Sequence, residues 1–215
     1  SYIKDGVTTL EIDQIVNDFI LRNGATPATL GYFGYPKSCC TSINEIVCHG
    51  LPDETKIRNG DIINVDVTTI LGGFFGDTSR TYFVGEVSDR AKKITKCAED
   101  AMYKGIECVT PNGFTGDIGF ETNKLVTRSG YSTIKEIGGH GIGKVFHLDP
   151  FVPAWGKKGR GERLVPFTCI TVEPMINEGT DQFISYDIPG STIQYYKTAD
   201  NGLSAQFEHT ILITD

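Results

Sequence analysis

Five side chains of the kinds that bind divalent metals stand in separate segments along the chain: Asp66, Asp77, His140, Glu173 and Glu208. The first two share GDIINVDVTTILGGFFGDTSR, and the others lie in GGHGIGKVFHLDP, TVEPMINEG and SAQFEHT. Four carboxylates and one imidazole carry enough donor atoms, with bridging, for two divalent cations. They suit oxygen-preferring metals better than a thiolate site would. The set predicts a dinuclear metal hydrolase.

Asp66 and Asp77 give the strongest local signal. The stretch 61–84 predicts a hairpin, because IINVDVTTI is rich in β-branched residues and a glycine pair follows Leu71. With the turn around Leu71 and Gly72, the aspartates would face each other directly, with Cβ atoms about 4.5–5.5 Å apart. Such carboxylates repel unless a cation or proton lies between them. Two solvated aspartates on an exposed sheet are the alternative, but the apolar neighbours of Asp66 make unpaired charge expensive.

The other three candidate ligands have plain alternatives when each is taken alone. His140 lies in a glycine-dense segment, which predicts a loop that lets a ligand approach closely, or a flexible loop with an incidental histidine. Glu173 precedes a proline, which limits it to a strand end or edge. Glu208 interrupts an apolar strand, and a structural salt bridge is the alternative for both glutamates. All these alternatives holding together is much less probable than any single one.

The remaining histidines divide by their surroundings. His147 follows His140 closely and could be a second ligand or a substrate-facing donor. His49, in IVCHGLP, is as compatible with a core histidine as with an active-site donor. His209 adjoins Glu208 and is expected on the opposite face of its strand.

The elements that must position these residues follow from periodicity and from capping and breaking residues. Helices are predicted over 8–22, with Thr8 or Thr9 as cap and Glu11 completing a capping box, over 88–109, and over 116–130. Beyond the hairpin, β segments are expected at 28–36, 41–52, 165–176, 191–199 and 203–214. The basic stretch 155–164 is interpreted as a solvated loop. One α+β domain is the simplest account.

Composition narrows the function. The chain has 215 residues, 39% hydrophobic and 22% charged, as in ordinary globular proteins. Its net charge of −7 supplies no cationic footprint, which argues against binding to nucleic acid. No apolar run approaches the ~20 residues that span a bilayer, and no signal peptide opens the chain. The six cysteines are scattered without a CxxC pair, which disfavours a zinc finger and fits a reducing, cytoplasmic setting.

Taken together, the motif segments resemble the signature segments of type I methionine aminopeptidases, in order and spacing. They are INEIVCHGLP, GDIINVDV, GFFGDTSR, GGHGIGKVFH, TVEPM and SAQFEHT, and the resemblance extends from GVTTLEID to ILITD. It implies the pita-bread fold: an α+β arrangement of pseudo-twofold halves, with a curved antiparallel sheet, flanking helices and metals at the centre. Residues 1–215 would be a single catalytic domain that lacks the N-terminal helix usual in the family.

The resemblance also assigns roles. It implies two divalent ions, Mn, Fe or Co, with Zn also acceptable, held by Asp66, Asp77, His140, Glu173 and Glu208. Asp77 and Glu208 would bridge both ions, and a hydroxide shared by the ions would attack the scissile carbonyl. Glu173 would transfer a proton, His49 would lie near the scissile nitrogen, and His147 would stabilise the tetrahedral intermediate.

A methionine pocket is also implied, and it is where this chain departs from the family. Its lining residues would be Tyr32, Tyr35, Cys40, Phe146 and Gln194, the first four suiting a thioether. Gln194 stands where a tryptophan is common and would open or polarise one wall. Gly138 replaces a usual cysteine, Phe33 a common histidine, and Asp5 a proline.

Three functions therefore compete. The first is removal of the initiator methionine from nascent proteins by a cytoplasmic monomer, in transient contact with the ribosome and without binding nucleic acid or membrane. The second is a related X-Pro aminopeptidase or prolidase, which normally carries an extra N-terminal domain and different surroundings for the first histidine. The third is a non-catalytic binding module of the same fold, which is disfavoured because such relatives lose ligands.

Overall fold

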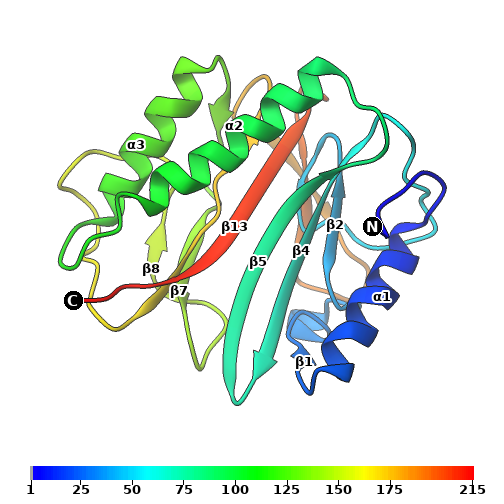
Figure 1. Ribbon diagram of the computed structural model, residues 1–215, viewed down its shortest axis with the longest axis horizontal. Coiled ribbons are helices and arrows are strands. Elements are labelled where there is room, and N and C mark those ends of the chain that lie inside the picture. Colours follow the sequence, from blue (N-terminus) through cyan, green and yellow to red (C-terminus); the bar gives the residue numbers. More distant parts are fainter. Residues whose placement is uncertain (1) are drawn as a thin grey trace.

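In a computed structural model, residues 2–215 form an α+β structure in which helices cover an antiparallel sheet (Figure 1). The helices are α1 (Thr9–Arg22), α2 (Asp89–Ile106) and α3 (Thr115–Arg128), with a short 3-10 turn at Tyr32–Gly34. The strands are β1 (Thr26–Pro27), β2 (Cys40–Ile43), β3 (Ile46–Cys48), β4 (Ile62–Leu71), β5 (Phe74–Phe83), β6 (Ser132–Thr133), β7 (Gly139–Ile142), β8 (Leu148–Val152), β9 (Cys169–Val172), β10 (Met175–Asn177), β11 (Phe183–Asp187), β12 (Gln194–Thr198) and β13 (Ser204–Leu212). The predicted α+β class is confirmed.

Ten of these strands form the main sheet, whose central path is β1-β4-β5-β13-β9-β7-β8. β2 adds to β4, and β10 joins β13 to β6. The other three strands form a smaller sheet in the order β11-β12-β3, and β3 ends at the residue before His49. Strand β13, near the C-terminus, lies between β5 and β9, so it joins the hairpin half of the sheet to the half formed by β7, β8 and β9 (Figure 1).

The helices supply the apolar core on one face of this sheet. Figure 1 shows α2 lying across β13, with α3 beside it. The cluster there buries Ile94, Ala98 and Ala101 of α2 with Val172 and Phe207 of the sheet. Burial of about 25 cal/mol per Å² of apolar surface makes this the main source of stability. The opposite face of the same strands is thereby left for other side chains.

Helix α1 begins as its sequence predicts. The Thr8 side chain accepts from the Glu11 backbone, and the Glu11 carboxylate accepts from the Thr8 backbone at 2.8 Å, which completes the capping box. The helix packs Ile12 against Ile63 and Val65 of β4, on the face that α2 also covers. Helices α2, capped by Ser88, and α3 likewise match the predicted segments, although α2 ends at Ile106.

The hairpin is confirmed, but its register differs from the prediction. The turn falls on Gly72 and Gly73, so Asp66 lies opposite Ser79, and Asp77 lies opposite Thr68. The two aspartates are therefore diagonal neighbours on one face, where side chains can still meet. The prediction placed the turn too early, because a glycine pair does not itself specify which residues occupy the corner.

Two further predictions are wrong in detail. The segment 28–36 is not a strand: it contains the 3-10 turn, with Phe33 in the left-handed region at φ 47°. The glycine-dense segment around His140 is strand β7 rather than a loop. The segment 41–52 forms two short strands, β2 and β3, before the loop at His49. The stretch 155–164 is a loop, as predicted.

All six cysteines are free thiols, and four of them are buried. Within residues 2–215, no helix is long and apolar enough to cross a membrane.

A buried carboxylate ties α1 to the strand that enters the site. Asp13 Oδ1 accepts backbone N–H bonds from Ser38 at 2.7 Å and from Cys39 at 3.1 Å. The next residue, Cys40, pairs with Asp66 in the β2–β4 register. Asp13 therefore fixes the backbone beside a candidate ligand, although its own sequence context gives no sign of that role.

Replacement of this carboxylate should destabilise the fold. Asp13→Ala leaves two buried amides without an acceptor, so we expect the free energy of unfolding to fall by about 2–4 kcal/mol in denaturant titrations. Asp18→Ala on the exposed face of the same helix is the control, with an expected change within about 0.5 kcal/mol. Equal effects of the two substitutions would contradict the anchoring role.

Candidate metal centre

The candidate ligands share the face of the sheet that points away from the helices. On β13, Phe207 packs with α2 and the His209 ring lies 5.8 Å from that of Tyr103 on α2, so Glu208 between them points the other way. The expectation for His209 is confirmed. Val172 likewise faces the helical core, and Glu173 follows it at the end of β9. Strand alternation thus gathers acidic residues from distant segments on one surface.

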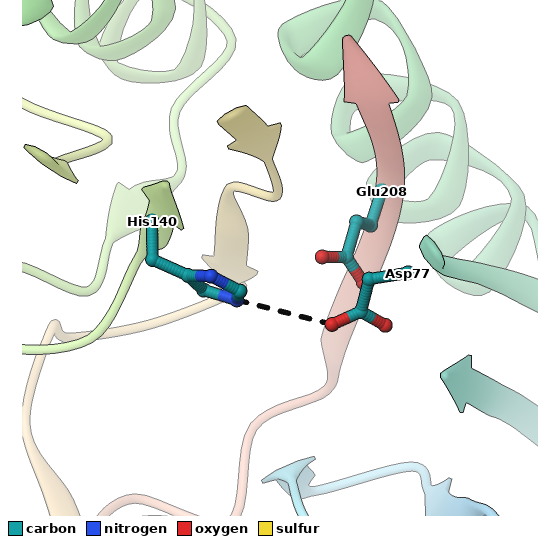
Figure 2. A group of neighbouring side chains, drawn as sticks. All are labelled: Asp77, His140 and Glu208. Carbon is teal, nitrogen blue, oxygen red and sulfur yellow. Dashed lines mark ion pairs between the residues drawn. The ribbon is translucent and has the colours of Figure 1, made fainter. Parts of the chain in front are cut away.

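The side chains converge closely. His140 Nε2 lies 3.8 Å from Asp77 Oδ2 and 3.6 Å from Glu173 Oε1. One ligand atom each from Asp77, His140 and Glu208 lies within 4.8 Å of the others. Figure 2 shows His140 reaching from β7 toward Asp77, with Glu208 on β13 beside it. Asp66 contacts Asp77, and Glu173 contacts Glu208, so all five predicted ligands form one cluster.

Neutral donors orient two of these carboxylates. Thr68 Oγ1 donates to Asp77 Oδ1 at 2.7 Å. Thr171 Oγ1 donates to Glu173 Oε1 at 2.8 Å, and Gln206 Nε2 donates to Glu173 Oε2 at 3.1 Å. These three residues were not singled out from the sequence. The signal was available, because Thr68, Thr171 and Gln206 each stand two positions from a candidate ligand, on the same strand face.

His140 is held with one nitrogen free. Its Nδ1–H donates to the Gly141 carbonyl at 2.9 Å, so the neutral ring presents an Nε2 lone pair toward the carboxylates. Its backbone N–H donates to Thr171 Oγ1 at 2.9 Å. The flanking glycines permit this close packing: a Cβ on Gly139 would lie 2.2 Å from the Thr171 carbonyl oxygen.

Burial and mutual repulsion dominate the electrostatics of the cluster. Burial, and then repulsion from Asp77, raises the pKa of Glu208 well above its usual range, and the same two causes act on Asp66. Burial and the Glu173 charge raise the pKa of Asp77 to about 7. Burial raises the pKa of Glu173, although the hydrogen bond from Thr171 opposes it. Burial lowers the pKa of His140.

The donor set fits divalent cations. Among the described residues, Asp66 Oδ1 and Glu208 Oε1 are buried without a hydrogen-bond partner. A lone pair of His140 faces two carboxylates, an arrangement that repels unless positive charge lies between them. Oxygen and imidazole donors gathered in this way suit divalent cations. The residues present therefore fit the divalent cations that the sequence predicts.

The cluster forms the floor of a cavity of about 250 Å³. Thirteen further residues line it beside the five candidate ligands, and together they include every predicted site residue except Gln194. The predicted ones beyond the ligands are Tyr32, Tyr35, Cys40, His49, Phe146 and His147. The sequence did not identify Thr29, Glu136, Ile137, Phe151 or Ile193 as lining residues. Glu136 apart, they carry no chemical signature, and tertiary packing brings all five to the cavity.

The prediction that Gln194 lines the pocket is wrong. Its side-chain Nε2 donates to Asp187 Oδ1 at 2.8 Å, across the β11–β12 pair and away from the cavity. The preceding residue, Ile193, lines the cavity instead. Adjacent residues of an extended chain point to opposite sides, so a one-residue difference decides which side chain meets the substrate. The Gln194 backbone still contributes, because its carbonyl accepts from His49 Nδ1 at 3.1 Å.

The sequence profile of metallopeptidase family M24 matches residues 1–215. The chain belongs to metallopeptidase family M24. It is 47% identical over 214 residues to methionine aminopeptidase A of Synechocystis sp., covering 99% of this chain and 83% of that protein. It is 42% identical over 216 residues to the methionine aminopeptidase of Escherichia coli, covering 100% of this chain and 80% of that protein. These matches confirm the resemblance to methionine aminopeptidases.

Solved structures of a methionine aminopeptidase and a prolidase have the same fold as this chain. The crystal structure of methionine aminopeptidase from Rickettsia prowazekii matches with a TM-score of 0.95 and 45% identity, covering 99% of this chain and 84% of that one. The prolidase from Pyrococcus horikoshii matches with a TM-score of 0.71 and 22% identity, covering 99% and 53%, and shares the fold alone. The predicted pita-bread fold is confirmed.

The cluster of candidate ligands predicts that the stability of the metal-free protein depends on pH in an unusual way. A carboxyl group whose pKa is higher in the folded state than in the unfolded state stabilises the fold at low pH. For Asp77, with an ordinary pKa of 3.8, this contribution is complete below pH 3.8 and is lost as pH rises through about 7. The cavity histidines act oppositely, because their pKa values are lowered from 6.5, so their contribution is complete above that pH. Above pH 6.5, the stabilisation lost by the carboxyl groups therefore determines that the stability of the folded state falls as pH rises.

We expect the melting temperature of chelator-treated protein to fall between pH 6.5 and pH 8. Added Mn²⁺ should raise it and remove the decline, because the ions bind the folded state selectively. The melting temperature of the metal-free Asp77→Asn variant should fall less over the same pH interval. A melting temperature that rises over this interval without metal would contradict the geometry, and so would a slope that Mn²⁺ leaves unchanged.

Proposed function

We propose that this chain is a metal-dependent methionine aminopeptidase that removes the N-terminal methionine from peptides and nascent proteins. The observation that carries the proposal is the combination, in one cavity, of five convergent metal donors and a wall of aromatic rings with a thiol. Metals held by the donors would activate water, and the aromatic wall with its thiol would select a thioether side chain. The names and identities of the M24 relatives support this substrate over an X-Pro peptide.

The ligand set proposed is Asp66, Asp77, His140, Glu173 and Glu208, around two divalent ions. Asp77 and Glu208 are the proposed bridging ligands, and their burial next to each other supports this, because each carboxylate needs compensating charge on more than one side. Ions held there would supply Lewis-acid activation of water and of the scissile carbonyl. Mn, Fe and Co are the proposed ions, with Zn also compatible.

The remaining chemistry belongs to the protein. Glu173 is the proposed proton carrier: Thr171 and Gln206 hold both of its oxygens in place, so the group can take and return a proton without reorienting. His49 presents its Nε2 lone pair, because Nδ1–H is committed to the Gln194 carbonyl. It can therefore accept a hydrogen bond from the N–H of the scissile amide. His147 is the proposed donor to the oxygen that becomes negative.

The proposed methionine pocket is made by Tyr32, Tyr35, Cys40 and Phe146. Tyr35, Cys40 and Phe146 are buried. Tyr35 is fixed because its hydroxyl donates to the Gly50 carbonyl at 3.1 Å, and Phe146 is packed at 4.7 Å between ring centroids from Tyr32. A thioether fits such a wall through sulfur–aromatic contacts worth about 0.3–1.5 kcal/mol each. An N-terminal methionine would thus be held with its amine toward the carboxylates.

The biological setting follows from the same proposal. We infer a monomer that works in the cytoplasm on newly made chains, in transient contact with the ribosome. We also infer that residues 1–215 act as one catalytic domain.

Activity and metal binding should fail together when a bridging ligand is changed. The protein loaded with Mn²⁺, Fe²⁺ or Co²⁺ should release methionine from Met-Ala-Ser and should bind two equivalents of metal. Asp77→Asn should lower activity by about 100-fold or more and weaken metal binding by about 10–100-fold. Asp89→Asn, at an exposed site on α2, is the control. Cleavage of X-Pro peptides in preference to Met-Ala-Ser would favour the prolidase alternative, and no cleavage with any metal would overturn the proposal.

His147 should behave as a donor rather than as a ligand. His147→Ala removes a hydrogen bond proposed to act mainly in the transition state, so kcat should fall by about 100–1,000-fold while the metal content stays at the wild-type value. Peptide kinetics and elemental analysis of the same sample test this. Loss of the metal together with activity would instead make His147 a ligand.

A further inference from the structure

Three histidines of the described chain line the cavity, and each uses Nδ1 for a hydrogen bond. His49 Nδ1 bonds the Gln194 carbonyl at 3.1 Å, and His140 Nδ1 bonds the Gly141 carbonyl at 2.9 Å. His147 differs, because its Nδ1 lies 2.8 Å from the hydroxyl oxygen of Tyr32. Two partners are backbone carbonyls and one is a phenol, and this difference determines what each ring can do.

A carbonyl oxygen can only accept, so its histidine must carry the proton on Nδ1. The neutral ring then presents a lone pair at Nε2. This suits His140 as a metal ligand and His49 as an acceptor. Neither ring, while neutral, can donate a hydrogen bond from Nε2 into the cavity.

The phenol of Tyr32 allows the opposite tautomer. A phenol is a much stronger acid than a neutral imidazole N–H, and the imidazole nitrogen is the better acceptor, so the favoured bond runs from the Tyr32 O–H to His147 Nδ1. The proton of the His147 ring must then lie on Nε2. Among the cavity histidines of the described chain, His147 is thus the one equipped to donate while neutral.

The contacts around Tyr32 restrain its ring, which lies 4.7 Å from that of Phe146 between centroids, and the turn that carries it. Tyr32 begins the 3-10 turn, and the carbonyl of the next residue, Phe33, accepts from Thr192 N at 3.0 Å and from Ser191 Oγ at 2.9 Å. The His147 ring is stacked on Phe146, with centroids 4.2 Å apart and planes 16° apart. Both partners of the hydrogen bond are therefore restrained by neighbours outside the pair.

We propose that Tyr32 is a positioning residue that fixes His147 as the Nε2–H tautomer, so that the ring donates to the carbonyl oxygen of the bound peptide. The role of the donor rests on the proposed aminopeptidase function, whereas the tautomer rests on the geometry alone. Tyr32 thus does more than form a wall of the methionine pocket. Its hydroxyl selects the hydrogen-bonding character of a neighbouring catalytic side chain.

The tautomer can be measured without any turnover. Long-range ¹H–¹⁵N spectra of ¹⁵N-histidine-labelled protein, metal-free and loaded with diamagnetic Zn²⁺, distinguish protonated from unprotonated ring nitrogens, and His147→Ala identifies the His147 signals. We expect an unprotonated Nδ1 for His147 and, in metal-free protein, an unprotonated Nε2 for His49 and His140. Tyr32→Phe should shift His147 toward the other tautomer. A protonated Nδ1 in the neutral wild-type ring, or a tautomer unchanged in Tyr32→Phe, would overturn the proposal.

Kinetics then test the consequence. Tyr32→Phe keeps the ring and its packing, so we expect kcat on Met-Ala-Ser to fall by about 10-fold or more and KM to change less. Tyr103→Phe is the matched control, because its hydroxyl lies 3.5 Å from His209 Nε2 on the helical face, and its activity should be unchanged. A raised KM with unchanged kcat would reduce Tyr32 to a pocket wall. If wild-type protein cleaves no methionyl peptide, the proposed function fails, and the spectra still decide the tautomer.

Discussion

The mutual repulsion of four adjacent carboxylates, two of them buried and two partly buried, is the constraint around which this structure is arranged. Asp77 and Glu208 are almost fully buried, and Asp66 and Glu173 adjoin them. Unpaired charges at such positions cost several kcal/mol each, so no fold would keep them together without compensation. Neutral donors such as Thr68 and Thr171 offset part of this cost. Divalent cations held there would offset the remainder, which would make metal binding part of the stability of the folded state.

The strands of the main sheet have two different faces, and the apolar core on one face offsets the destabilisation caused by the clustered charges on the other. Val65, Val172 and Phe207 bury their side chains toward the helices, and the residue that follows each of them is a candidate ligand on the other face. Stability and chemistry are therefore built from the same strands with period two. A one-residue slip of β4 or β13 would exchange the two sets, so the helical core also enforces the register that the metal centre requires.

The sequence predicted the parts of the fold that local chemistry determines. Capping residues located α1 and α2, the glycine pair located the hairpin, and four acids and His140 in distinctive segments located the five candidate ligands that the structure brings together. It failed where tertiary contacts decide: the 28–36 segment is a turn because Phe33 bonds to Ser191 and Thr192, distant in sequence. It also placed Gln194 in the cavity, although strand parity gives that place to Ile193. Supporting residues such as Gln206 could have been found by applying strand alternation outward from each ligand.

The histidines show why residue type alone does not define a role. His49, His140 and His147 have the same side chain and line the same cavity, yet the atom that meets each Nδ1 gives them different capacities at Nε2. Two of these partners are backbone carbonyls, which no side-chain substitution removes. The third is a side chain, Tyr32, on a turn that tertiary contacts hold. The proposed donor function of His147 is therefore the one that mutation can change most readily, while the lone pairs of the other two are secured by the backbone itself.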